Sequence, residues 1–315
     1  MVITQEGPGF RHEALPYGAD ATLLDQVTRF LGPALEKGEP VLIATKGESL
    51  SSLEEAFHGH DLVDLTPIEE VGRNPGRLIW LWQDFLDRNG AAERIVWGVG
   101  EPIYAGRDAA ELVEGQIHER LLNRAFNGSQ FALHLGCPYD MSSLPGDVTD
   151  EMGRSHPFIA NGAGSRDNEG FQPADQEAPP APLGPALIPD AAFIPFDEQS
   201  LGRMRRQLAG EARNCGVDET RIPDLLLAVN EIATNSILYA GAGSLGVWQD
   251  SGQIVCEVRD QGFIDDDLVG RLRPAITEEQ GRGIWFAHQV ADLLQFRSAP
   301  SGTQWRIIFD CGSPR

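Results

Sequence analysis

The sequence contains no long apolar run and no secretory leader. None of its 315 residues lies in an apolar stretch close to the ~18 residues that cross a bilayer. The first residues lack the basic start and apolar core of a signal peptide. Hydrophobic residues (41%) and charged residues (23%) are balanced as in folded globular proteins. We therefore expect a globular protein of the cytoplasm that does not enter a membrane.

Basic residues are scarce. Lys and Arg total 25 against 47 Asp and Glu, which gives a formal net charge of −22. This charge repels nucleic acid phosphates, and no cluster of basic residues offsets it. We predict no direct binding of nucleic acid, and the acidic surface is explained either by solvation or by a basic protein partner.

Cysteine is also rare. The four cysteines are widely spaced and form no Cys-x-x-Cys pair, which argues against a zinc ribbon or a redox dithiol. Disulfides are uncommon in the cytoplasm, so we expect buried thiols at Cys137, Cys215, Cys256 and Cys311.

A segment rich in Pro, Gly, Ala and acids divides the chain. It shows neither helical nor strand periodicity, which is typical of a linker. The chain is also longer than one hydrophobic core usually serves. We predict an N-terminal domain over residues 1–164, a linker over 165–190 and a C-terminal domain over 191–315.

The N-terminal part alternates short apolar runs with amphipathic stretches. Strands are predicted at residues 41–44, 95–99 and 131–135, and helices at 20–35, 78–87 and 108–126. This alternation favours an α/β three-layer sandwich with a mostly parallel sheet. The turn after the first of these strands lacks the spacing of a phosphate loop, so we predict no nucleotide hydrolysis there.

The C-terminal part has a different pattern. Helices are predicted at residues 197–212, 218–239 and 284–294, and strands at 253–258 and 304–309. Two helices come first, and alternating strands and one more helix follow. This order predicts an α+β domain in which helices cover one face of a sheet, a two-layer sandwich.

Two polar residues stand out on the second of these helices. At about 100° per residue, Glu231 and Asn235 share a face turned away from the apolar stripe, so they can act on one ligand. Gly-Arg-Gly at 281–283 precedes the last helix, where backbone N–H groups and the positive helix end favour phosphate.

Four short motifs occur in order in this part of the chain. They are Asn-Glu-Ile-Ala-Thr-Asn at 230–235, Val-Arg-Asp-Gln-Gly at 258–262, Gly-Arg-Gly-Ile at 281–284 and Gly-Thr at 302–303. The series resembles the N, G1 and G2 boxes of the GHKL (Bergerat-fold) ATPases, especially the anti-sigma-factor serine/threonine kinases. The order and spacing of several boxes are more specific than any single box.

The resemblance implies that the domain binds Mg-ATP. Asn235 would supply an oxygen to Mg²⁺, and Glu231 would orient or deprotonate the attacking hydroxyl as general base. Gly281 and Gly283 would form the phosphate lid, with Arg282 as an additional cation.

The same resemblance places the adenine. Asp260 would accept a hydrogen bond from the adenine amino group, and Gly262 would let the backbone approach the ring closely. Thr303 would add a polar contact beside them.

One box departs from the family. The second glycine of the G1 box is replaced by Ile264, which is followed by aspartates at 265–267. Carboxylates near a triphosphate are repulsive unless they are solvated or bound to metal. The departure leaves open whether the domain binds ATP and turns it over.

A histidine kinase would need a phosphoacceptor histidine on a helical hairpin before the ATPase domain. The sequence has no histidine between His156 and His288. The resemblance therefore implies a hydroxyl of another protein as the phosphate acceptor.

The N-terminal half carries a second resemblance. Its motifs are His-Glu-Ala-Leu-Pro-Tyr at 12–17, Phe-Leu-Gly-Pro-Ala-Leu-Glu-Lys-Gly-Glu at 30–39, Trp-Gly-Val-Gly-Glu at 97–101, Cys-Pro-Tyr-Asp at 137–140 and Ser-His-Pro at 155–157. These residues resemble the MEDS sensory domain, a family related to RecA-like sheets and proposed to sense small molecules. In actinobacterial proteins, the MEDS domain is often fused to an anti-sigma-type ATPase.

Two groups of N-terminal residues are of chemical interest. Four soft ligands fit no standard metal spacing, so we predict no metal at His12, His134, Cys137 and His156. Three others follow or end strands, where a parallel sheet opens its ligand crevice, so candidates for signal binding are Glu101, Tyr104 and Tyr139.

Together these features predict a cytoplasmic regulator of transcription. The ATPase domain would bind a sigma factor, or phosphorylate a serine of an anti-sigma antagonist with Mg-ATP, under control of a small-molecule signal at the N-terminal domain. The alternative is a non-catalytic module that sequesters its partner with or without nucleotide. Proteins of this type commonly dimerise, so the resemblance also allows a homodimer.

Overall fold

The computed structural model describes residues 9–18, 21–161, 164–173, 183–274 and 281–312. The chain forms two compact units, Met1–Ala178 and Pro179–Arg315. Among the described residues, no helix combines the length and apolar character needed to cross a membrane.

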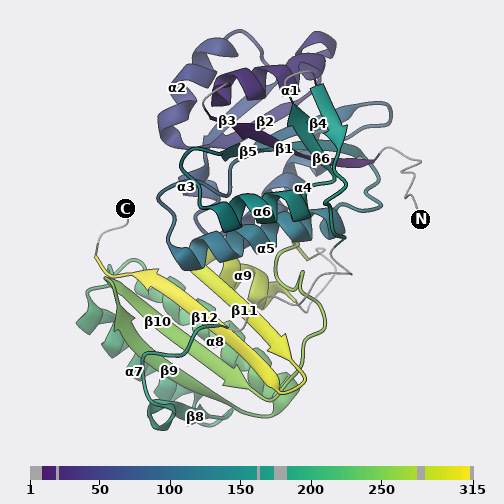
Figure 1. Cartoon of the computed structure of the whole chain (residues 1–315). Coiled ribbons are helices and arrows are strands. Elements are labelled where there is room, and N and C mark those ends of the chain that lie inside the picture. The colour runs from purple at the N-terminus through teal and green to yellow at the C-terminus, as the bar shows by residue number, and fades with distance from the viewer. Residues whose placement is uncertain (1–8, 19–20, 162–163, 174–182, 275–280, 313–315) are drawn as a thin grey trace. The chain divides into compact units, whose positions relative to one another are not determined.

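The first unit contains a seven-stranded sheet in the order β3-β2-β4-β5-β1-β6-β7 (Figure 1). Its strands are β1 (Phe10–Tyr17), β2 (Val41–Thr45), β3 (Val63–Pro67), β4 (Ile95–Gly100), β5 (Ala132–Asp140), β6 (Phe158–Asn161) and β7 (Gly164–Asp167). All neighbouring strands run parallel except β6 and β7, which form an antiparallel hairpin. The mostly parallel sheet predicted from the alternating pattern is confirmed.

Helices cover both faces of this sheet. They are α1 (Leu23–Lys37), α2 (Gly47–Ala56), α3 (Ile68–Val71), α4 (Leu78–Asn89), α5 (Ala109–Ala125) and α6 (Gly146–Ser155). Figure 1 shows α1 and α2 on one face and α4, α5 and α6 on the other. Capping boxes at Thr22 and Asp108 begin α1 and α5. The three-layer α/β architecture is therefore present as predicted.

Strand alternation assigns each side chain of β4 to one layer. Trp97 and Val99 join the apolar cluster of α1 and α2, while Gly98 and Gly100 face the ring of Trp82 on α4. A Cβ at Gly98 would lie 2.9 Å from that ring. Glycine on the α4 face thus makes room for a fully buried tryptophan.

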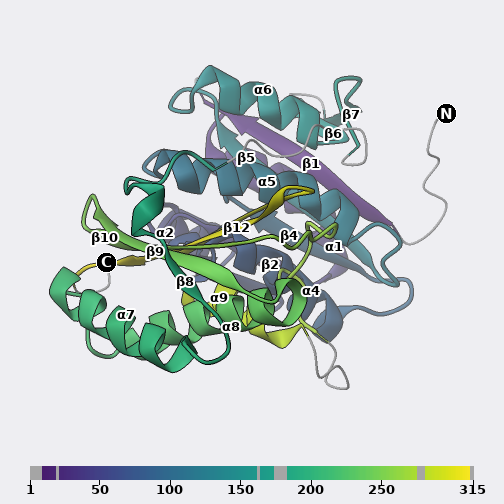
Figure 2. The same ribbon diagram turned by 90° about the horizontal axis from the view of Figure 1, so that it is seen from below.

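The second unit contains a five-stranded antiparallel sheet in the order β11-β12-β10-β9-β8. The strands are β8 (Ile194–Phe196), β9 (Gly243–Asp250), β10 (Gln253–Asp260), β11 (Leu293–Ala299) and β12 (Gly302–Asp310), and the helices are α7 (Leu201–Cys215), α8 (Ile222–Ala240) and α9 (Arg282–Val290). The three helices lie on one face of the sheet (Figure 2) and share one apolar core with it. This confirms the α+β two-layer sandwich.

The predicted helix over residues 284–294 is wrong in its extent. The helix α9 ends at Val290, and residues 293–299 form β11, which pairs with β12. Its apolar residues Leu293 and Leu294 are buried in the sheet. A short apolar run fits either a helix or a strand, and here tertiary pairing makes it a strand.

The opposite face of this sheet carries a buried charge cluster. Glu257 is 1% exposed and accepts hydrogen bonds from Arg259 and Arg306, which flank it. The Arg259 guanidinium lies 3.9 Å above the Phe193 ring, and Arg306 also donates to the carbonyl of Gly184. The chain just before β8 therefore packs on this face.

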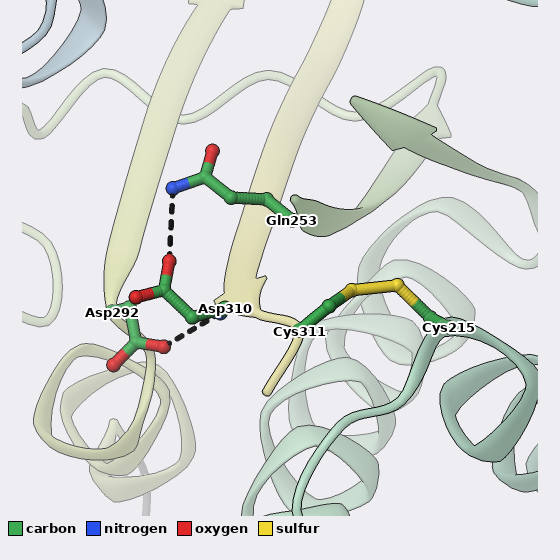
Figure 3. The surroundings of a disulfide bond; sticks show 5 residues. All are labelled: Cys215, Gln253, Asp292, Asp310 and Cys311. Carbon is green, nitrogen blue, oxygen red and sulfur yellow. Dashed lines mark hydrogen bonds between the residues drawn. A yellow bond between two sulfur atoms is a disulfide. The ribbon is translucent and has the colours of Figure 1, made fainter. Parts of the chain in front are cut away.

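A disulfide joins Cys215 at the end of α7 to Cys311 after β12 (Figure 3). The expectation of unpaired thiols is wrong for this pair, because a hydrogen bond from Gly312 N to Gly216 O (2.7 Å) brings the two chain segments together. The two cysteines are 96 residues apart in the sequence, and their spacing does not predict that they pair. Cys137 and Cys256 are free and buried, as expected.

We predict that this bond stabilises the second unit. Cys215→Ser should lower the free energy of unfolding of the oxidised protein by about 2–4 kcal/mol, because the cross-link restricts the unfolded chain over a long loop. Urea unfolding with and without a thiol reductant measures this. Reductant should destabilise the parent and the control Cys256→Ser but leave Cys215→Ser unchanged. Equal stability of the parent in both conditions would contradict the prediction.

Candidate functional site

The predicted helix residues lie on α8 at the edge of its buried stripe. Leu225, Val229 and Ile232 are buried against the sheet, whereas Glu231 and Asn235 are only partly buried. Neither polar side chain has a hydrogen-bond partner among the residues that the structure describes. The spacing predicted one shared polar face, and the helix places both side chains one turn apart on it.

The start of α9 lies directly against Glu231. A Cβ added at Gly283 would clash with the Glu231 carboxylate oxygen Oε2, so glycine leaves room for that carboxylate. Gly281 caps the helix with a φ of 88°, a left-handed conformation that favours glycine. Arg282 is exposed in the first turn. The structure thus brings Glu231 and the Gly-Arg-Gly turn together, with backbone N–H groups of the helix start beside the carboxylate.

A second group forms around Asp260 at the end of β10. Its Oδ1 accepts from the backbone N–H of Gly262 (2.7 Å), and its Oδ2 accepts from the hydroxyl of Ser236 (2.6 Å). Ser236 lies on α8 and is 3% exposed. These bonds fix the carboxylate between the helix and the turn that follows the strand.

Thr303 completes this group from the neighbouring strand. It pairs with Asp260 in the β10–β12 register, and its hydroxyl donates to the carbonyl of Gly262 (2.8 Å). The Ser298 hydroxyl lies 3.0 Å from that of Thr303 and accepts from the backbone N–H of Ile264 (2.8 Å). Asp260, Gly262 and Thr303 are therefore held together by hydrogen bonds.

Sequence reasoning misses two residues of this network. Ser236 directly follows Asn235 in the first motif, so the helical spacing could have placed it on α8 beside the strand end. Ser298 lies in β11, a strand that the periodicity does not identify, and no sequence signal links it to Thr303. Only the β11–β12 pairing sets the two hydroxyls side by side.

The departure at Ile264 has a structural explanation. Its side chain packs against the apolar core of the second unit, and its backbone is held by Ser298. The aspartates Asp265 and Asp266 that follow are exposed. A core side chain thus occupies the position of the second glycine, and these carboxylates are solvated.

In the first unit, Glu101 lies at the carboxyl ends of three strands. It follows β4 and is 1% exposed. Its Oε1 accepts from the hydroxyl of Tyr17 at the end of β1 (3.0 Å), and its Oε2 accepts from the backbone N–H of Lys46 after β2 (3.2 Å). Burial raises the pKa of Glu101 to about 6. Such a carboxylate at strand ends fits a ligand crevice of a parallel sheet.

Among the described residues, no hydrogen bond joins the other two candidates to Glu101. Arg107 lies over the Tyr104 ring at 4.6 Å and donates to two backbone carbonyls after α3. Tyr139 is 1% exposed, and its ring meets the edge of His156. Tyr139 is a core residue, and the residues gathered at Glu101 are Tyr17 and Lys46.

The pKa of Glu101 predicts a pH dependence of stability. The folded carboxyl holds its proton more tightly than the unfolded one, so its contribution is complete below about pH 4.5 and is lost as pH rises through about 6. The loss amounts to about 2 kcal/mol, because the ionised form is poorly solvated.

Thermal unfolding of the parent and of Glu101→Gln from about pH 4.5 to about pH 7 tests this. The glutamine variant should lose less stability over that range than the parent or the exposed control Glu54→Gln. Parallel curves for all three proteins would contradict the assignment.

Two family models match the chain. Residues 11–157 match the MEDS model, described as "MEthanogen/methylotroph, DcmR Sensory domain", and residues 194–309 match the "Histidine kinase-like ATPase domain" model. The chain therefore carries a MEDS domain followed by a histidine kinase-like ATPase domain, as its motifs predict.

Solved structures give more distant matches. The Acinetobacter baumannii histidine kinase AdeS is 13% identical, with 38% of this chain and 68% of that chain covered and a TM-score of 0.24. The catalytic domain of the histidine kinase ThkA is 12% identical, with 38% and 96% covered and a TM-score of 0.27. Likeness at this level assigns no activity. No curated protein matches the sequence.

Proposed function

We propose that this protein is a cytoplasmic regulator whose ATPase domain binds Mg-ATP and phosphorylates a serine or threonine of a protein partner. The observation that carries the proposal is the contact between the Glu231 carboxylate and Gly283 at the start of α9. A general base and a phosphate-binding helix end are thereby adjacent. The partner class that the motifs favour is a sigma factor or an anti-sigma antagonist, under control of a signal at the MEDS domain.

Each part of the site has a role in this proposal. Asn235, one turn from Glu231, would supply an oxygen ligand to Mg²⁺, which neutralises charge during phosphoryl transfer. Asp260 would accept a hydrogen bond from the adenine amino group, with Gly262 and Thr303 bonded beside it. Glu231 would take the proton of the attacking hydroxyl.

The substitution Asp260→Asn tests nucleotide binding without disturbing the fold. An asparagine can still accept from Gly262 N and can donate to the Ser236 hydroxyl, which in turn has the carbonyl of Ile232 as acceptor at 3.2 Å. The fold is therefore kept, while the charge that would face the adenine amino group is lost.

Calorimetric titration of Mg-ATP measures the consequence. Binding should weaken at least about tenfold in Asp260→Asn and in Asn235→Ala. The exposed controls Asp250→Asn and Asn214→Ala should bind as the parent does. No binding of Mg-ATP by the parent would overturn the nucleotide-binding proposal.

Glu231→Gln tests the chemical step. It should keep Mg-ATP binding but lower transfer of the γ-phosphate to a candidate antagonist protein by about 10²–10⁴-fold. The exposed Glu211→Gln on α7 is the matched control. Gly283→Ala should have a similar effect by displacing the carboxylate, whereas Gly210→Ala, a helix position with open space, should have none.

The alternative function is a non-catalytic, partner-sequestering module. The observation that favours it is Ile264, which fills the position of the second G1 glycine with a core side chain. Mg-ATP binding without transfer in the parent, together with partner binding that Glu231→Gln leaves intact, would establish the alternative and reject the kinase.

A further inference from the structure

Four buried side chains converge in the first unit, away from the residues gathered at Glu101. They come from β1, α5, β5 and the end of α6, and they are His12, Glu119, Cys137 and His156. Each is at most 1% exposed. Their inward atoms all lie within 4.8 Å of one another. Neither the family matches nor the sequence motifs assign a role to this cluster.

Strand alternation explains which residues meet. On β5, Cys137 points to the layer of α5 and α6, and His134, three residues earlier, points to the opposite layer beside Trp97. His134 therefore lies apart from the other three residues of the set for which the sequence spacing predicts no metal, and that set does not include Glu119. Glu119 from α5 takes the fourth position, which no ligand spacing in the sequence indicates.

Hydrogen bonds outside the cluster fix both imidazole rings. The Nδ1 of His12 lies 3.2 Å from Oδ1 of Asn123, whose amide nitrogen donates to the carbonyl of Ser155 (2.7 Å). The Nδ1 of His156 lies 3.0 Å from the carbonyl of Met152. The Ser155 hydroxyl also lies 3.0 Å from Nδ1 of His156. With both Nδ1 atoms engaged outside the cluster, both Nε2 atoms point into it.

The cluster contains buried polar atoms that lack hydrogen-bond partners among the described residues. The Nε2 of His12 is 2.9 Å from Oε2 of Glu119 and 3.3 Å from Sγ of Cys137. The Nε2 of His156 is 3.2 Å from the same Oε2 but makes no hydrogen bond in the described part of the chain. The other carboxylate oxygen of Glu119, Oε1, is also buried without a hydrogen-bond partner in the described part of the chain. Buried acceptors without donors are costly, and a cation would satisfy all of them.

The distances suit a small tetrahedral cation. Metal–ligand bonds of about 2.0–2.3 Å place the four ligand atoms about 3.3–3.7 Å apart. Separations of 2.9, 3.2 and 3.3 Å, with all four atoms within 4.8 Å of one another, can reach this spacing by small side-chain shifts. The thiolate and the imidazoles favour zinc over Mg²⁺ or Ca²⁺. One thiolate and one carboxylate also neutralise a divalent ion, which a site without solvent requires.

We propose that His12, Glu119, Cys137 and His156 form a closed structural zinc site that ties β1, β5, α5 and α6 together. Four protein ligands leave no open position, as in structural zinc sites. Asn123 and the Met152 carbonyl orient the histidine ligands from outside the site.

Elemental analysis of the full-length protein, purified under reducing conditions, tests this. The parent should contain one zinc per chain. Cys137→Ser should lose it, while Cys256→Ser, which changes the other free and fully buried cysteine, should retain it. Full zinc content in Cys137→Ser would overturn the proposal.

Cobalt substitution gives a second readout if Cys137→Ser fails to fold. Metal-stripped parent and Cys256→Ser should take up one Co²⁺ and develop the charge-transfer absorption of a cobalt–thiolate bond. Zinc should abolish that absorption by competition. A parent that is purified without stoichiometric zinc and that binds no Co²⁺ would also overturn the proposal.

Discussion

Asp260 accepts hydrogen bonds from two elements that the chain order separates, the helix α8 and the turn after β10. The side chain of Asp260 is short and lies at the last residue of its strand. It can reach both donors only if the helix crosses the sheet at that end of the strand. The apolar stripe of α8 sets this crossing, because it buries Val229 and Ile232 against the sheet. The same crossing brings Glu231 to the start of α9. The geometry of the candidate site therefore follows from how one helix packs.

The first unit depends on a different constraint, the two-residue period of its strands. In a sheet covered on both faces, this period decides which polar residues meet and which are kept apart. On β5 it places Cys137 with His12 and His156 and sends His134 to the other layer. Polar side chains inside such a sheet need partners from the covering helices, and α5 supplies Glu119 and Asn123.

The sequence predicts long periodic elements well and short or paired ones poorly. The helix α8 and the strand β10 have clear periodicity, which is enough to place Glu231 on a helix face and Asp260 at a strand end. The strand β11 has a short apolar run that fits helix or strand, and pairing with β12 decides between them. The bond between Ser298 and Ile264 and the Cys215–Cys311 disulfide join segments 34 and 96 residues apart, and periodicity does not encode such contacts.

The altered G1 box weighs less against nucleotide binding than its residue types suggest. Ile264 packs its side chain against the apolar core of the second unit, and its backbone N–H donates to the Ser298 hydroxyl. Asp265 and Asp266 are exposed, where water and salt screen their repulsion of a triphosphate. The hydrogen bonds of Asp260, Gly262 and Thr303 remain intact around this change. The departure therefore coexists with a complete hydrogen-bond network around Asp260, and it weighs less against the proposed adenine site than its residue types alone suggest.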